Sequence, residues 1–251
     1  MARWLTGQGF SRVSVLEGGL AGWRDAGLPM DRLEGELPAA TDEPSPLGLD
    51  EPERAAFLPS LAHRYLLAGG LPARRRLATL FVDIAGSTRL LAHHPPERAL
   101  AVVQRFMRLV TEVALAYCGD VKDFEGDGAL LYFESAGEAA QAALAIQAAL
   151  AGGTCDRETP IAARMSLTIG DVVLGVVGST MRQAIALVGP SVSVGARLLK
   201  QIPPGGLIAS GEAVEAIRAE APQLAVEFRL LDPAHEVAGG DGITVATYAI
   251  S

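Results

Sequence analysis

Hydrophobic and polar positions over the C-terminal two thirds of the chain change period in a way that predicts alternating strands and helices. An almost unbroken apolar run at Leu77–Ile84 predicts a buried strand, and apolar residues at helical spacing predict a helix over Pro95–Tyr117. Two short strands, Asp120–Phe124 and Ala129–Phe133, flank a Gly-Asp-Gly turn. The alanine-rich segment Ala136–Ala151 then predicts a second helix.

The pattern continues with two strands, Ala162–Ile169 and Val172–Val177, joined by a predicted turn at Gly170-Asp171. A helix is predicted over Val192–Gln201, and the chain closes on the strand-like segment ITVATYAI. The order β-α-β-β-α-β is that of a ferredoxin-like α+β fold. We therefore expect an antiparallel-rich, palm-type sheet with helices packed on one face.

The N-terminal third follows a different pattern. Gly9–Met30 contains Leu-x-Gly-Gly, Gly-Trp and Ala-Gly-Leu-Pro elements, which resemble the C-terminal end of a rhodanese domain. The resemblance implies a small α/β remnant over residues 1–32, as a vestige or as the end of a domain that starts upstream of Met1. It implies no sulfurtransfer, because that family uses a cysteine nucleophile from an earlier loop and no cysteine precedes Cys118. Proline-rich residues 33–73 predict a linker with a helical segment, and residues 74–251 the main domain.

Net charge and cysteine content indicate which kinds of partner and which cellular compartment to expect. A net charge of −8 and a pI near 5.1 argue against nucleic acid or an anionic membrane as the main partner. With no signal-peptide core and two cysteines expected to be free thiols, Cys118 and Cys155, the sequence predicts a soluble cytoplasmic protein. The basic cluster Arg74–Arg76 is either a solvated strand entry or a contact for a partner or phosphate.

Two aspartates, Asp83 and Asp127, are the candidate metal-binding residues. Asp83 ends an apolar strand and precedes Ala85, Gly86, Ser87 and Thr88, whose backbone N–H groups could cradle phosphate oxygens. Taken alone, Asp83 could be a helix cap and Asp127 an ordinary turn residue. In a ferredoxin-like sheet, however, the first strand lies beside the central hairpin, so the two carboxylates would converge. Two carboxylates with phosphate oxygens suit Mg²⁺ or Mn²⁺.

Four segments together resemble the class III nucleotidyl cyclase catalytic domain over Arg74–Ser251: FVDIAGSTRLL, FEGDGALLYF, LTIGDVVLGVVGS and VGPSVSVGARL. The resemblance implies conversion of ATP or GTP to the 3′,5′-cyclic nucleotide and pyrophosphate, in cyclic-nucleotide signalling. It implies two metal ions held by Asp83, Asp127 and the Ile84 carbonyl, a triphosphate at Ala85–Thr88, and transition-state stabilisation by Arg197. It also implies a head-to-tail homodimer with active sites at the interface.

Three positions depart from the family pattern. Asp123 stands where the family has a base-recognising lysine or glutamate, and Lys122 would face the opposite side of the strand unless a bulge intervenes. Ala186 occupies the second base-recognition position, and Ser193 replaces an asparagine that orients the ribose. A lost polar contact of this kind costs about 1–3 kcal/mol. The alternative function is therefore a catalytically weak or inactive nucleotide-binding regulatory module.

Overall fold

The computed structural model describes residues 70–153, 160–179, 182–239 and 242–250. All of them belong to the second of two compact units, Glu51–Ser251. The predicted rhodanese-like remnant over residues 1–32 and the linker up to residue 69 lie outside the described residues, as does Cys155.

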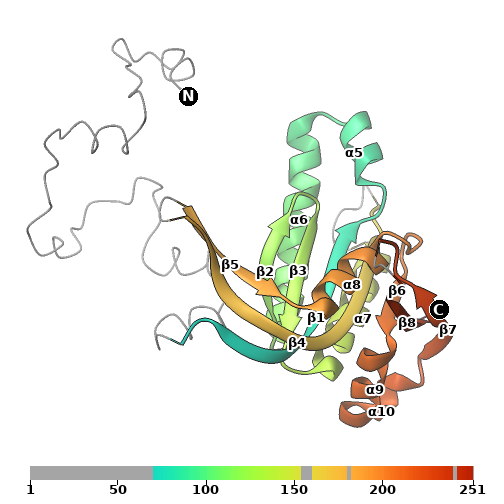
Figure 1. The fold of residues 1–251 in the computed structure, drawn as a ribbon. Helices are drawn as coiled ribbons and strands as arrows, with labels where there is room; N and C mark the ends of the chain where they lie inside the picture. Colours follow the sequence, from blue (N-terminus) through green and yellow to red (C-terminus); the bar gives the residue numbers. More distant parts are fainter. Residues whose placement is uncertain (1–69, 154–159, 180–181, 240–241, 251) are drawn as a thin grey trace, which may run out of the picture. The chain divides into compact units, whose positions relative to one another are not determined.

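The first half of the described chain has the predicted β-α-β-β-α-β order, with one added short helix, α5 (Ser87–His93), after the first strand (Figure 1). The six core elements are β1 (Ala73–Ile84), α6 (Pro96–Ala116), β2 (Asp120–Glu125), β3 (Gly128–Phe133), α7 (Ala136–Ala151) and β4 (Ala163–Ser179). The predicted α+β class is confirmed.

The second half adds strands to one side of the sheet and a hairpin to β4. Its elements are β5 (Arg182–Val188), α8 (Pro190–Leu199), β6 (Leu207–Ser210), α9 (Gly211–Glu220), α10 (Pro222–Ala225), β7 (Phe228–Glu236) and β8 (Thr244–Ile250). The strand order is β2-β3-β1-β4-β6-β8-β7, with β5 paired to β4. Among the described strands only β4 and β6 pair in parallel, so the sheet is antiparallel-rich as expected.

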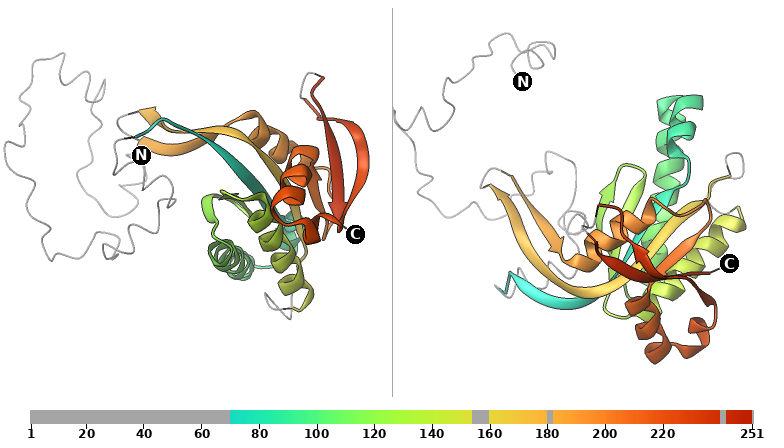
Figure 2. Two further views of the ribbon diagram at one scale, coloured as in Figure 1. Left: turned by 90° about the horizontal axis from the view of Figure 1, so that it is seen from below. Right: turned by 45° about the vertical axis from the view of Figure 1, so that its right-hand side comes forward.

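Helices cover both faces of the sheet, which corrects the expectation that they would share one face. Helices α6 and α7 cover one face, where Phe106, Leu131 and Ile146 are fully buried in the main core. Helix α8 lies on the opposite face, across β1 and β4 (Figure 2, left). Its close approach requires Gly195, because a Cβ there would lie 3.0 Å from Cδ2 of Phe81. None of the described helices is long and apolar enough to cross a bilayer.

The turn predicted at Gly170-Asp171 is wrong. Strand β4 continues through both residues, because β1 begins earlier than expected and pairs Leu77 with Gly170 and Arg76 with Asp171. Gly170 instead makes room for helix α8, since a Cβ there would lie 2.8 Å from Oγ of Ser191.

Candidate active site

Asp83 and Asp127 are brought together by the antiparallel pairing of β1 with β3. Asp83 pairs in register with Gly128, and Asp127 lies in the tight turn just before that residue. The N–H of Ile84 donates to the carbonyl oxygen of Asp127 at 3.2 Å, which ties the strand end to the turn. The predicted convergence is therefore present, and Asp127 is both a turn residue and a neighbour of Asp83.

A small cavity of about 130 Å³ opens at this junction. It is lined by Phe81, Val82, Asp83, Glu125, Asp127, Gly128, Ala129 and Leu199. Gly128 keeps the two strands close, because a Cβ there would lie 3.0 Å from the carbonyl oxygen of Val82. Although Glu125 also lines the cavity, the described residues contain no group of three or more histidine, cysteine or acidic side chains placed to hold a metal.

Arg164 is the residue at this site that the sequence reasoning missed. Its Nε donates to Oδ1 of Asp83 at 2.9 Å and its Nη2 to Oδ2 at 2.6 Å, a bidentate charge-assisted pair. The hydrogen bond to Asp83 and the charges of Asp83 and Asp127 raise the pKa of Arg164, against a smaller lowering by burial. An arginine among the apolar residues at the start of β4 was the available signal.

The two aspartates fit a divalent cation in chemistry, and Arg164 competes for one of them. Carboxylate oxygens are the hard ligands that Mg²⁺ and Mn²⁺ prefer, and Asp83 and Asp127 face one cavity. Both carboxylate oxygens of Asp83 are engaged by the guanidinium. A cation that uses Asp83 must therefore share or displace Arg164.

The loop after β1 offers fewer backbone donors than the sequence suggested. The N–H of Ala85 donates to the carbonyl oxygen of Ala162 at 2.8 Å, so it is already engaged. Gly86 has φ +75°, in the left-handed region that favours glycine, and is the N-cap of α5 without a side-chain cap. Asp83 is therefore not the helix cap. The N–H groups of Ser87 and Thr88 make no hydrogen bond to any described residue.

Strand β2 contains a β-bulge. A bulge is the feature that Lys122 needs in order to avoid facing the opposite side of the strand from the base-recognition position. The pairing shifts between Val121, which pairs with Leu131, and Asp123, which pairs with Leu130, so Lys122 is the extra residue. Its Nζ donates to Oδ2 of Asp123 at 2.9 Å. The side chain of Lys122 is 16% exposed and that of Asp123 is 53% exposed, so the pair presents its acid to solvent.

The other predicted site residues lie away from the two aspartates. Ser193 is exposed and Arg197 half-buried on α8, while Ala186 on β5 pairs with Gly175. Neither Ser193 nor Arg197 lines the cavity around Asp83, although Leu199 at the end of α8 does. Within one chain, the structure therefore brings together the two aspartates, Arg164 and the loop that follows Asp83, while Ser193, Arg197 and Ala186 lie apart from them.

Curated relatives match part of this chain, and no protein-family model matches it. It is 32% identical over 151 residues to the uncharacterized protein Rv1318c of Mycobacterium tuberculosis, a match that covers 58% of this chain and 28% of that protein. The uncharacterized protein Rv1319c of the same organism is 31% identical over 147 residues, 57% of this chain and 28% of the relative. The chain thus spans little more than a quarter of these relatives.

Solved structures with a similar fold include nucleotide cyclases. The guanylate cyclase domain of RhGC from Catenaria anguillulae in complex with GTP is 21% identical, with a TM-score of 0.61, covering 71% of this chain and 98% of that domain. The adenylyl cyclase CyaB from P. aeruginosa is 22% identical with a TM-score of 0.60, covering 71% of this chain and 95% of CyaB. A bacterial light-regulated adenylyl cyclase is 24% identical with a TM-score of 0.65, covering 78% of this chain and 59% of that one. The described part of this chain therefore has the fold of the class III adenylyl and guanylyl cyclase catalytic domains.

Proposed function

We propose that this chain is a nucleotidyl cyclase that converts ATP or GTP to the 3′,5′-cyclic nucleotide and pyrophosphate. The observation that carries the proposal is the pair Asp83 and Asp127, which line one cavity on a cyclase fold. In the reaction the ribose 3′-oxygen forms a bond to the α-phosphorus, and the bond from that phosphorus to the pyrophosphate oxygen breaks. The proton of the 3′-hydroxyl passes to solvent water.

Asp83 and Asp127, with the Ile84 carbonyl, would hold Mg²⁺ or Mn²⁺, two ions per site. Once bound, these ions would neutralise the triphosphate and acidify the 3′-hydroxyl. Arg164 would exchange the Asp83 carboxylate for phosphate oxygens, which a planar guanidinium binds with the same two-donor geometry. The N–H groups of Gly86, Ser87 and Thr88 would contact the triphosphate.

Base selection would fall to Lys122 and Asp123. Lys122 is the bulged residue beside Asp123, and their ion pair holds the ammonium and leaves the acid more exposed. An exposed acid can accept hydrogen bonds from guanine N1–H and N2–H₂, whereas a lysine donor serves adenine. Ala186 offers no hydrogen bond to either base, so we expect weak discrimination between ATP and GTP.

We infer a head-to-tail homodimer, because Arg197 and Ser193 lie outside the cavity that holds the aspartates of the same chain. A partner chain would supply Arg197, which would stabilise charge on the α-phosphoryl group, and Ser193 beside the ribose. A mixing experiment tests this arrangement. Asp83→Asn and Arg197→Ala should each be inactive alone, while their equimolar mixture should regain about a quarter of wild-type activity, from the one intact site of each mixed dimer.

The direct test is incubation of the purified chain with ATP or GTP and Mn²⁺ or Mg²⁺, followed by mass detection of the cyclic product. Asp83→Asn and Asp127→Asn should abolish product, and Asp232→Asn on β7, remote from the cavity, should leave it unchanged. The lack of cyclic product from a confirmed wild-type dimer at high protein concentration would refute catalysis.

A second candidate is a regulatory module that binds nucleotide without turnover. The observation in its favour is that three positions of the cyclase pattern carry different residues in this chain, namely Asp123, Ala186 and Ser193. The two aspartates, in contrast, remain in place. This function predicts metal-dependent binding of ATP or GTP, measured by calorimetry, with no cyclic product in the same samples.

A further inference from the structure

A second, larger cavity lies at the end of the only parallel strand pair among the described strands. It has a volume of about 660 Å³, within the range of small-molecule sites. Strand β4 pairs with β6 only from Met165 to Leu167, and beyond that point β6 turns into α9. Helix α8, which connects β4 to β6 by way of β5, begins at the same end and lies on the other face of the sheet.

This arrangement is a crevice where β6 ends and β4 runs on past it, between helices that lie on opposite faces of the sheet. The cavity is distinct from the one between the aspartates, since the two share no lining residue. Arg76, which lines it, precedes Asp83 by seven positions on β1, or roughly 23 Å of extended strand.

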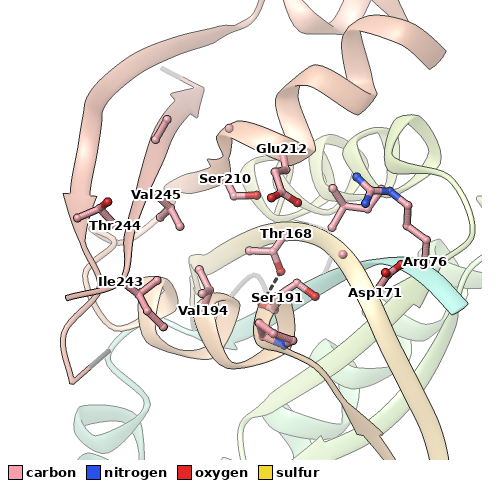
Figure 3. Close-up of a pocket in the computed structure, with 15 residues that line it drawn as sticks. Arg76, Thr168, Asp171, Ser191, Val194, Ser210, Glu212, Ile243, Thr244 and Val245 are labelled. Carbon is pink, nitrogen blue, oxygen red and sulfur yellow. Dashed lines mark hydrogen bonds between the residues drawn. The ribbon is translucent and has the colours of Figure 1, made fainter. Parts of the chain in front are cut away.

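The cavity has an apolar end and a charged end (Figure 3). Ile243, just before β8, and Val245 on β8 stand at one end. Arg76 and Asp171 stand at the other end, with Glu212 and Ser191 on opposite sides between them. A ligand that fills the cavity would therefore have an apolar body and a polar head.

The cavity is lined by one cationic and one acidic side chain that no other described residue neutralises. Asp171 is paired with Arg74 at 2.6 Å. The side chains of Arg76 and Glu212, in contrast, are exposed and form no ion pair or hydrogen bond with any other described residue, yet both residues line the cavity. Opposite charges that face one cavity without pairing suit a head group carrying both an anion and a cation.

Helix α8 adds donors beside Arg76. Oγ of Ser191 is buried without a hydrogen-bond partner among the described residues, and Ser191 lines the cavity. Helix α8 has no side-chain cap, so no capping side chain accepts a hydrogen bond from the N–H groups of its first turn. A rotation of the Ser191 side chain about its Cα–Cβ bond would turn this hydroxyl into the cavity, where a ligand oxygen that accepts from it would remove the cost of leaving it unsatisfied.

We propose that this cavity binds a zwitterionic small molecule with an apolar body, such as an α-amino acid with an aromatic side chain. Its carboxylate pairs with Arg76 and accepts from Ser191, its ammonium pairs with Glu212, and its apolar part packs against Ile243, Val245 and Val194. Binding here does not require turnover at the aspartates. Because α8 also carries Ser193 and Arg197, the ligand would act as an effector on that helix.

The test is a binding titration of the purified chain in EDTA without nucleotide, followed by NMR and calorimetry. The probe is L-phenylalanine, with 3-phenylpropionate, which lacks the ammonium, and 2-phenylethylamine, which lacks the carboxylate, as matched compounds. We expect saturable binding of L-phenylalanine and binding of each matched compound weaker by roughly ten-fold or more, as for loss of one charged hydrogen bond.

Two variants locate the site. Arg76→Met and Glu212→Gln should each weaken L-phenylalanine binding by roughly ten-fold or more. The control Arg229→Met changes an exposed arginine on β7 that does not line the cavity, and it should bind as wild type does. Thermal unfolding of each variant shows that it is folded. Absence of L-phenylalanine binding, equal binding of 3-phenylpropionate, or binding that survives Arg76→Met would each overturn the proposal.

Discussion

Replacing Arg164 with methionine should make the stability of the domain depend strongly on divalent cations. Methionine keeps much of the length and apolar surface of the side chain but removes both donors to Asp83. The variant then has two neighbouring carboxylates, Asp83 and Asp127, without the guanidinium group of Arg164 that lies beside them in the wild type.

The size of the effect follows from how far the pair is buried. The side chain of Arg164 is 29% exposed and that of Asp83 is 17% exposed, between a surface pair and a buried one. Surface pairs contribute about 0–1 kcal/mol, whereas removing one partner of a buried pair costs about 3–5 kcal/mol. We therefore expect Arg164→Met to lower the free energy of unfolding by about 1–3 kcal/mol when no divalent cation is present.

Saturating Mg²⁺ should remove most of this loss, because a cation shared by the two carboxylates replaces the missing guanidinium. By thermodynamic linkage, the variant should bind Mg²⁺ more tightly than wild type by the same free energy, roughly 5- to 150-fold. Urea unfolding with EDTA and with Mg²⁺ measures the first quantity, and calorimetric titration of Mg²⁺ measures the second.

Arg74→Met is the matched control, because the Arg74–Asp171 pair has the same 2.6 Å contact but side chains that are 74% and 51% exposed. It should change stability by less than about 1 kcal/mol, with or without Mg²⁺. If Arg164→Met loses the same stability in EDTA and in Mg²⁺, the carboxylates do not share a cation and the reasoning fails.

Two further substitutions test a buried hydrogen bond between β4 and helix α8 and the pKa of an exposed cysteine. Thr168→Val removes a buried hydroxyl that donates to the carbonyl oxygen of Ser191 at 2.9 Å, so chemical unfolding should show a loss of about 1–3 kcal/mol; an unchanged stability would contradict this. The charge of Glu138, and a hydrogen bond to it, raise the pKa of Cys118. Glu138→Gln should therefore lower that pKa and increase the rate of iodoacetamide alkylation at mildly alkaline pH in a Cys155→Ser background, and an unchanged rate would contradict this.

Hydrophobic periodicity and turn residues predicted the strands and helices that are specified by their own local sequence. The apolar run at Leu77–Ile84 and the hairpin around Asp127 were predicted correctly, and the approach of Asp83 to Asp127 then followed from placing the first strand beside the hairpin. No longer-range information was needed for that part of the site.

The missed features depend on register between distant segments. Gly170 has a turn-like sequence, but its role is to admit Ser191 of α8, twenty-one positions later in the chain. Arg164 pairs with Asp83 because β4 and β1 align these two residues directly, and no local pattern encodes that alignment. The bulge at Lys122 is likewise a property of two paired strands, and a one-residue shift changes which side chains share a face.

Helix α8 connects the two cavities through three contacts along its length. Ser191 near its start lines the larger cavity, Gly195 packs against Phe81 in the middle, and Leu199 at its end lines the cavity of the two aspartates. A Cβ at Gly195 would lie 3.0 Å from both Phe81 and Oγ1 of Thr168, so the helix has little freedom to move toward the sheet. A displacement of the helix along its own axis would carry Ser193 and Arg197 with it. A ligand at Ser191 could therefore alter the proposed catalytic groups without touching the aspartates, which would act as a coupling between two separate sites.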